Sequence, residues 1–551
     1  QLDIFTAPSM QLGSRASKKY SDPNAWHNQF YSLVTTKIDE EIFKPLFPEG
    51  KKSGRPNASI RILVAMSVLK EGFGCSDEDL FEKCEFDLLT RKALGMELLT
   101  DVTPSIDTYY LFRRRICEYQ ERTGIDLMQL CFEQLAGKHV HLLKISGKCV
   151  RMDSKLIGSN IARQSRYELI HTTLVKFLKT CTLTHLSPEQ EERAKEYLKE
   201  DSSKTVYRSD SDTLQSNLAR IGNFIMEMLA VFPATSPAHD LLLRLFEEQY
   251  AVMDGKAVLR DKKEVKADSL QNPNDPDATY RAKNDQKVQG YVTNITETVE
   301  EGKPNIITSV QVETAVFADC HFLQEAVENS ERVTGSTIED LYADGAYQSP
   351  DNREFAKNHN DMQLKTGKMQ GGCRWELIPH DEDGLTIREI ATGNTYEAVK
   401  AVTKQGSRKR WRIPWNNKTG WRYFEDKDIK AYQLRKQIES LPLEEQHKRN
   451  NVEAAMFQYS FHTHNGKTRY RGLLKHRMHA YSRCMWMNLR RMVIFQISTF
   501  QRSIFALFGP IREAFGSFKA ISRQIFTSGA DCYVSLRMTT LVRLDSKYAP
   551  F

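Results

Sequence analysis

The sequence lacks an apolar run long enough to cross a bilayer. Its most apolar late segment, Met492–Phe508, is interrupted by Gln501 and Arg502. No signal-peptide pattern opens the chain. None of the ten cysteines forms a Cys-x-x-Cys pair, which argues against a zinc ribbon or a disulfide framework and fits a reducing compartment. These absences predict a cytoplasmic protein without a membrane partner.

Negative charge is scarce at the C-terminal end. Residues 467–551 carry fifteen Lys and Arg but three acids, a net charge of +12, whereas the whole chain has +7 and the preceding residues therefore −5. A basic end on a slightly acidic body suggests a polyanion partner, and Arg490 and Arg491 are candidate phosphate contacts. A solvated basic helix face is the alternative.

The length of 551 residues exceeds one compact core and predicts three or four domains. Residues 57–140 have helical periodicity, with Ser105 as the cap of a helix through Tyr119. Several short helices followed by one rich in Arg and Tyr resemble a helix-turn-helix DNA module. Its candidate DNA contacts are Arg113, Arg114 and Arg115. Adjacent arginines on a solvated helix face are the alternative.

Three acids stand out by their positions. Residues 147–155 are typical of a short buried strand ending in Asp153, and residues 338–347 form a second strand-like run that reaches Asp344. Further on, Glu453 lies among apolar residues of a helical stretch. An isolated strand-end Asp often only caps the next turn. Two such residues and a helix Glu, however, are the parts of a two-metal phosphoryl-transfer site.

The expected elements follow the order of a known core. A first strand precedes a long helical insert, a hairpin over 288–299 and 306–315, a helix over 321–332, the strand of Asp344, a helix over 352–359 and a short strand over 362–365. Strand, hairpin, helix, strand, helix, strand, helix is the order of an RNase H-like core. In that fold the first and fourth strands are neighbours, so their acids converge, and a later helix brings the third acid over them.

A second insert, residues 366–425, has alternating runs and turn signals that predict β structure. Its end interleaves basic and aromatic residues, which suits phosphate contact and stacking on unpaired bases. The candidates are Arg410, Trp411, Trp415 and Trp421, with Trp415 the one expected to stand free. A hairpin with its aromatics in a small core is the alternative.

The chain resembles bacterial insertion-sequence transposases of the DDE class from about Met10 to Leu489. The resemblance is carried by five stretches in the right order, at residues 54–58, 151–155, 275–279, 342–347 and 449–453. It implies that Asp153, Asp344 and Glu453 are the catalytic triad and the metal ligands.

Related transposases carry a Tyr-Arg-Glu-Lys signature around the third acid. Arg449 lies four residues before Glu453, as the signature requires, and would contact DNA. The Tyr position holds Gln446 and the Lys position holds Ser460, so Lys467 is a candidate for the missing charge.

The predicted fold class is multidomain α/β, with an RNase H-like mixed-sheet catalytic core, a helical insert and a β-rich insert, preceded by an all-helical N-terminal domain. The predicted parts are an N-terminal arm (1–56), a helix-turn-helix-like domain (57–140), the first catalytic strand (141–164), the helical insert (165–270), the continued core (271–365), the β-rich insert (366–425), the Glu-bearing helix region (426–500) and a basic tail (501–551).

The resemblance implies a DNA transposase in the bacterial cytoplasm, associated with the nucleoid. It would bind the terminal inverted repeats of its element, cleave the ends with two Mg²⁺ ions, for which Mn²⁺ can substitute, and join the 3′-OH ends to target DNA. A homodimer would hold two element ends in the DNA complex. Two alternatives remain: a nuclease on the same core without strand transfer, and a domesticated DNA-binding protein whose acids are structural.

Overall fold

The computed structural model describes residues 8–47, 58–232, 236–283, 286–366, 373–380, 384–401, 410–415, 420–440, 442 and 452–514. The chain is mixed α/β with a helical N-terminal region. It divides into two compact units. The first unit contains residues 1–147, 154–336 and 455–551, and the second contains residues 148–153 and 337–454.

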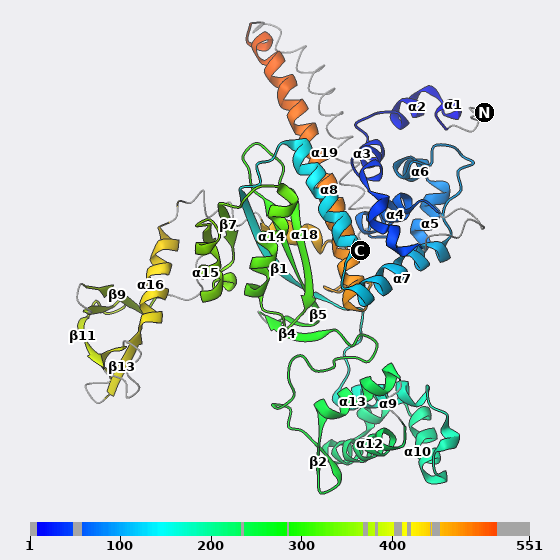
Figure 1. Cartoon of the computed structure of the whole chain (residues 1–551), viewed down its shortest axis with the longest axis vertical. Helices are drawn as coiled ribbons and strands as arrows, with labels where there is room; N and C mark the ends of the chain where they lie inside the picture. The colour runs from blue at the N-terminus through cyan, green and yellow to red at the C-terminus, as the bar shows by residue number, and fades with distance from the viewer. Residues whose placement is uncertain are drawn as a thin grey trace. The chain divides into compact units, whose positions relative to one another are not determined.

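The first unit begins with a series of helices, most of them short (Figure 1). These are α1 (Pro8–Gln11), α2 (Ser14–Tyr20), α3 (Trp26–Leu33), η2 (Thr35–Lys37), η3 (Glu40–Leu46), α4 (Ile60–Phe73), α5 (Asp77–Phe86), α6 (Leu88–Leu94), α7 (Ile106–Thr123) and α8 (Leu127–Leu143). Ser76 and Asp79 form a capping box that begins α5. Ser105 caps α7 as expected, and the helix continues beyond Tyr119 to Thr123.

The stretch expected to be an N-terminal arm is helical over residues 8–47. Phe30, Val34 and Phe43 are fully buried there. Two prolines of this stretch fit helical structure, because Pro8 opens α1 and Pro45 lies within the 3₁₀ helix η3. This part of the chain therefore contributes to the core of the helical region.

The helical region packs on α19 (Leu473–Ala514), which contacts α3, α4 and α8. The sequence predicts a separate tail from residue 501, but α19 continues through residue 514. Gly72 allows α4 to approach α19 closely, since a Cβ at this position would overlap the Trp486 ring. The N-terminal helices and the C-terminal helix thus share one core.

A buried carboxylate joins α4 to α19. The Nδ1 atom of His479 lies 2.6 Å from one oxygen of Glu71, and the Tyr470 hydroxyl donates to the other oxygen. Burial alone would raise the pKa of Glu71, but the charge and hydrogen bond of His479 and the charge of Lys70 outweigh it and lower the pKa from 4.5 to about 2. The carboxylate is therefore ionised and paired inside the protein.

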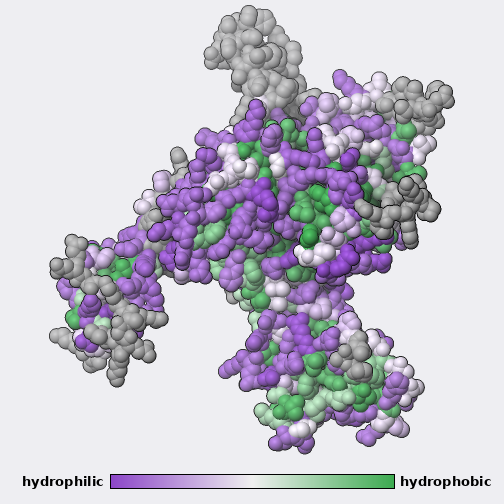
Figure 2. Space-filling model, in the orientation of Figure 1, coloured by the Kyte–Doolittle hydropathy of each residue, from purple (hydrophilic) through white to green (hydrophobic). Residues whose placement is uncertain are grey.

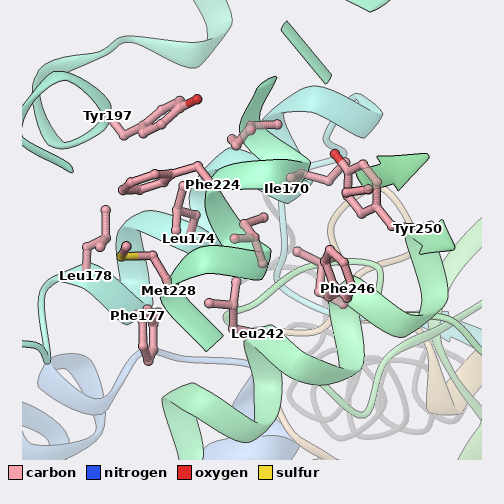
Figure 3. Packing of buried hydrophobic residues seen from close by; sticks show 14 of the residues in the cluster. Ile170, Leu174, Phe177, Leu178, Tyr197, Phe224, Met228, Leu242, Phe246 and Tyr250 are labelled. Atoms are coloured by element: carbon pink, nitrogen blue, oxygen red, sulfur yellow. The ribbon is translucent and has the colours of Figure 1, made fainter. Parts of the chain in front are cut away.

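A helical module with its own core lies within the first unit. It comprises α9 (Arg166–Leu178), η4 (Leu183–His185), α10 (Pro188–Lys199), α11 (Ser202–Arg208), α12 (Ser211–Val231), α13 (Pro237–Gln249), β2 (Tyr250–Met253) and β3 (Lys256–Leu259). Figure 3 shows Phe224 beside Tyr197 and Phe246 stacked on Tyr250, with ring centroids 5.2 and 5.4 Å apart. The β2–β3 hairpin was not expected in this insert, although its turn holds the hairpin signal Asp254-Gly255.

The principal sheet has six strands in the order β4-β5-β1-β7-β8, and β6 also pairs with β5. The strands are β1 (Cys149–Gly158), β4 (Thr279–Lys283), β5 (Gln286–Thr298), β6 (Ile307–Thr314), β7 (Asp340–Ala343) and β8 (Gln363–Thr366). The hairpin β5–β6 is antiparallel, whereas β7 is parallel to both β1 and β8. Between these strands come η5 (Asp319–Phe322), α14 (Leu323–Thr334), η6 (Gly345–Tyr347) and α15 (Pro350–Asn358). β1 belongs to both units, because the division falls between Asp153 and Ser154.

The second unit also contains an antiparallel five-stranded sheet in the order β13-β12-β11-β10-β9. Its strands are β9 (Trp375–Pro379), β10 (Leu385–Glu389), β11 (Thr395–Ala401), β12 (Arg410–Trp415) and β13 (Gly420–Glu425), followed by α16 (Asp426–Glu439). A small core of apolar side chains, including Trp375, Ile387 and Trp411, packs on one face. Among the helices that the structure describes, none has the length and apolar character needed to cross a membrane.

The buried pair gives a first prediction. Glu71→Gln removes the ionised acceptor of the His479 and Tyr470 hydrogen bonds, so the free energy of unfolding near neutral pH should fall by about 1.5–3 kcal/mol. Glu41→Gln, which removes one member of the exposed Glu41–Lys44 pair, is the control and should cost less than about 1 kcal/mol. Chemical denaturation of both variants measures the two losses.

The effect of Glu71 should depend on pH. Because the folded pKa lies below the ordinary value, Glu71 contributes stability that is complete above pH 4.5 and is lost as the pH falls toward 2. The stability difference between the wild type and Glu71→Gln should therefore shrink across this window. A difference that stays constant while the protein remains folded would contradict the assignment.

Candidate active site

Parallel pairing aligns the two aspartates expected to form the site. In the β1–β7 ladder, Val150 pairs with Leu341 and Arg151 with Tyr342. Two residues further along both strands stand Asp153 and Asp344. Because side chains alternate along a strand and neighbouring strands lie about 4.8 Å apart, this register puts the two aspartates side by side on one face. Both belong to the second unit and both are half-buried.

The two aspartates differ in local structure. Asp344 follows β7 directly, keeps an extended backbone with φ −77° and ψ 161°, and accepts a hydrogen bond from the Gly345 amide at 2.6 Å. It is a strand-end residue, as the sequence predicts. Asp153 is not, because β1 continues for five residues to Gly158. The polar residues Ser154 and Lys155 lie within β1 and are half-buried.

The third acid, Glu453, stands in the first turn of α18 (Val452–Tyr459). Its side chain is exposed, while Val452, Ala455, Met456 and Tyr459 are buried. The helix therefore presents Glu453 on the face opposite its apolar contacts. Arg449, predicted as its DNA-contacting neighbour, lies outside the described residues.

Lys155 connects β1 to α18 through hydrogen bonds that the sequence did not predict. Its ammonium donates to the Ser460 hydroxyl at 2.7 Å and to the Met456 carbonyl at 3.4 Å. Lys155 stands two residues after Asp153 and shares its side of β1. Met456 lies three residues after Glu453 on α18. The hydrogen bonds therefore tie the strand that carries one predicted catalytic acid to the helix that carries another.

The donor set suits a hard divalent cation. Carboxylate oxygens are the ligands that Mg²⁺ prefers, and Mg²⁺ sites commonly use one or two carboxylates together with substrate phosphate oxygens and water. The aligned Asp153 and Asp344 fit that pattern. Across the described ranges, no group of three or more His, Cys, Asp and Glu is gathered closely enough to hold a metal ion. The pair is thus the part of the predicted metal site that the structure brings together.

The three arginines of α7 do not form a common DNA-facing row. Arg113 is packed inside, with its guanidinium 5.4 Å from the Tyr109 ring centroid and 5.3 Å from that of Tyr470. Arg115 lies over the Phe47 ring. Arg114 is exposed and pairs with Glu118 at 3.5 Å. The prediction for Arg113 is corrected, because its charge is used within the fold.

The cations near the C-terminal end that were predicted to bind DNA also contact other parts of the protein. Arg491 forms a 2.7 Å ion pair with Glu297, whose side chain is fully buried, and donates to the Asn305 carbonyl. Arg490 is half-buried. The Lys467 ammonium donates to the Ile161 carbonyl at 2.7 Å. Arg491 therefore compensates a buried acid, and the prediction that it binds phosphate is corrected.

Of the aromatic residues in the five-stranded sheet that were predicted to stack on bases, one is buried and another is exposed. Trp411 is only 4% exposed and packs in the small core, so it lacks the free ring face that base stacking requires. Trp421 is 48% exposed, and the Arg412 guanidinium covers its ring at 4.2 Å. Arg410 pairs with Glu425 at 3.3 Å. The side chain of Trp415 lies outside the described residues.

One comparison with known proteins gives a match. Residues 19–115 match the family model of a transposase domain (DUF772). The match crosses the predicted boundary at residue 56 and lies within the N-terminal helical region. It does not include any of the three acids. No curated protein matches the chain. No solved structure matches it either. The match supports a transposase, and transposases in general cut and bind DNA.

The contrast between two tryptophans is testable. Trp411→Ala should open a cavity in the core of the five-stranded sheet and lower its stability by about 3–5 kcal/mol. Trp421→Ala removes a mostly exposed ring and one cation–π contact, so it should cost about 1 kcal/mol or less. Hydrogen exchange of the amides of β9 to β13 measures both changes. Equal losses in the two variants would contradict this division.

Proposed function

We propose that the chain is a DNA transposase of the DDE class that cleaves element ends and joins them to target DNA. The observation that carries the proposal is the parallel β1–β7 register, which aligns Asp153 with Asp344. The strand order β6-β5-β1-β7-β8, with an antiparallel hairpin and parallel β1, β7 and β8, is the arrangement expected for an RNase H-like core. The transposase-domain match supports the same class independently.

Each acid has a proposed role. Asp153, Asp344 and Glu453 would hold two Mg²⁺ ions, with Mn²⁺ able to substitute. When bound, such ions activate the attacking oxygen and stabilise the leaving oxygen of a phosphodiester. Asp153 and Asp344 supply two carboxylates from adjacent strands, and Glu453 supplies the third from an exposed helix position.

The proposed transposition reaction has two steps. Water forms a new bond to phosphorus, and the bond to the 3′ oxygen breaks, which frees a 3′-OH at the element end. That 3′-OH then attacks a phosphodiester of target DNA and displaces the target's own 3′ oxygen, so no bond energy from a cofactor is consumed. Arg449 would hold a phosphate of the DNA through its guanidinium.

A homodimer is part of the proposal, because joining an element requires two ends in one complex. The helical module offers an apolar surface: Val252, Met253 and Val258 of its hairpin are 58%, 59% and 41% exposed. Figure 2 shows apolar side chains gathered on the face of this module that is turned to the viewer. Such a patch is a plausible contact between two subunits.

The triad is tested by isosteric substitution. Asp153→Asn, Asp344→Asn and Glu453→Gln should each abolish metal-dependent cleavage of duplexes that carry the element ends, because each removes a ligand charge and little volume. DNA binding should persist. Asp340→Asn is the matched control on β7: Asp340 pairs with Lys365 at 2.8 Å, and the variant should still cleave. A triad variant that cleaves at a near-native rate would refute the assignment at that position.

A joining assay on the same preparations separates the two enzymatic alternatives. A transposase should convert released 3′-OH ends into joined target products, whereas a nuclease on the same core should stop after cleavage. Cleavage without any joined product, at saturating target DNA, would favour the nuclease.

Lys155 is proposed as a positioning residue that holds α18 against β1. Lys155→Met should raise the Mg²⁺ concentration needed for half-maximal cleavage by roughly tenfold or more, because residues that orient metal ligands commonly affect metal affinity by this amount. Lys148→Met removes the exposed pair with Glu339 at the start of β1 and should leave the Mg²⁺ dependence unchanged. A shift of the same size in both variants would show a general effect on β1 instead.

A further inference from the structure

A second cationic surface lies where β1 ends, and none of the predicted DNA contacts includes its arginines. The loop after β1 is joined to the segment before α19 by backbone hydrogen bonds. The Gly158 amide donates to the Gly466 carbonyl at 2.8 Å, and the Asn160 amide donates to the Tyr470 carbonyl at 3.0 Å. These bonds bring two distant parts of the sequence into one surface of the first unit.

Four exposed cations stand on this surface, which we call the β1-end surface: Arg163, Lys287, Arg469 and Arg471. Single hydrogen bonds to backbone carbonyls fix the three guanidinium groups. Arg163 donates to Lys287 O at 2.6 Å, Arg469 to Gly74 O at 2.6 Å, and Arg471 to Asn160 O at 2.7 Å. Because a guanidinium has five N–H donors, each arginine keeps donors for another partner.

The cations of the β1-end surface have no acid in direct contact. Over the part of the chain that the structure describes, none of the four forms an ion pair within 4 Å. Two carboxylates lie at the border: Asp277 accepts from the Leu473 amide at 3.2 Å, and the pKa of Asp79 is lowered by its hydrogen bonds with Ser76 and, to a smaller degree, by the charge of Arg469. Arg113 and Arg491, by contrast, face aromatic rings or a buried acid. Fixed arginines without an acid in direct contact are suited to bidentate contact with phosphates.

We propose that the β1-end surface binds the phosphate backbone of the DNA duplex that is being cut. This inference rests on the proposed function. Contacts to the phosphate backbone do not depend on the base sequence, so the surface should bind any duplex and should contribute to the salt dependence of binding.

Charge removal tests the proposal. The triple variant Arg163→Gln, Arg469→Gln, Arg471→Gln should bind a short duplex of arbitrary sequence more weakly, and the slope of log affinity against log salt should fall by roughly one for each arginine. The matched control replaces the exposed Lys199, Lys262 and Lys263 by Gln, again removing three charges from the first unit, and should keep the wild-type slope. A wild-type slope in the arginine variant overturns the proposal.

Two further measurements keep the test decisive. The triple Arg→Lys variant retains the charge and should restore most of the slope, which separates lost charge from lost fold. Ethylation of single phosphates should interfere with binding by the wild type at positions where it does not interfere with binding by the triple Arg→Gln variant. The same interference pattern for both proteins contradicts the surface.

Failure of this proposal can be told from failure of the proposed function. A wild-type protein that cleaves element ends, but whose binding slope does not depend on the three arginines, overturns the β1-end surface alone. A protein that neither binds duplex DNA nor cleaves element ends overturns both. If the slope depends on the arginines and the triad variants bind as the wild type does, the surface is a DNA contact separate from the chemistry.

Discussion

The parallel pairing of β1 with β7 is the constraint on which the candidate site depends. Main-chain hydrogen bonds fix the register, and the register fixes which side chains become neighbours. A slip by one residue would turn one aspartate to the opposite face and separate the two charges. Such a slip is costly, because it would turn the carboxylate of Asp344 onto the face where Val150, Met152, Leu341 and Ala343 are buried. Apolar packing therefore holds two like charges together at the place where a cation can bind between them.

Charge has two different uses in this chain, and composition cannot separate them. Arg113 and Arg491 belong to cation-rich segments, yet the fold uses them to pack against rings or to compensate Glu297. Arg469 and Arg471 come from the same basic end of the sequence and remain exposed without an acid partner among the described residues. The difference depends on which acids the fold brings near each cation, which is tertiary information. Net charge suggests a polyanion partner, but it does not identify the residues that would contact it.

Local pattern predicted much of the sheet and less of the site. The hairpin β5–β6, the strand before Asp344 and the helix that carries Glu453 follow from alternation, turn residues and apolar spacing. The continuation of β1 past Asp153 did not, because Ser154 and Lys155 are polar and pattern alone does not show that they are half-buried residues of a central strand. The burial of Trp411 and the hydrogen bond from Lys155 to α18 could be seen only in the three-dimensional structure, since both depend on contacts between residues that are far apart in the sequence. The adjacency of β1 and β7 was expected only from the resemblance to a known fold, not from the residues themselves.

The proposed function requires that Asp153, Asp344 and Glu453 together hold the two divalent cations. The most direct measurement replaces Mg²⁺ by Fe²⁺ and maps where hydroxyl radicals generated at the bound iron cut the polypeptide. Cuts are predicted close to residues 153, 344 and 453 in the presence of duplex DNA, and excess Mg²⁺ should suppress them. Cuts confined to other segments, or cuts near only one of the three acids, would contradict this requirement.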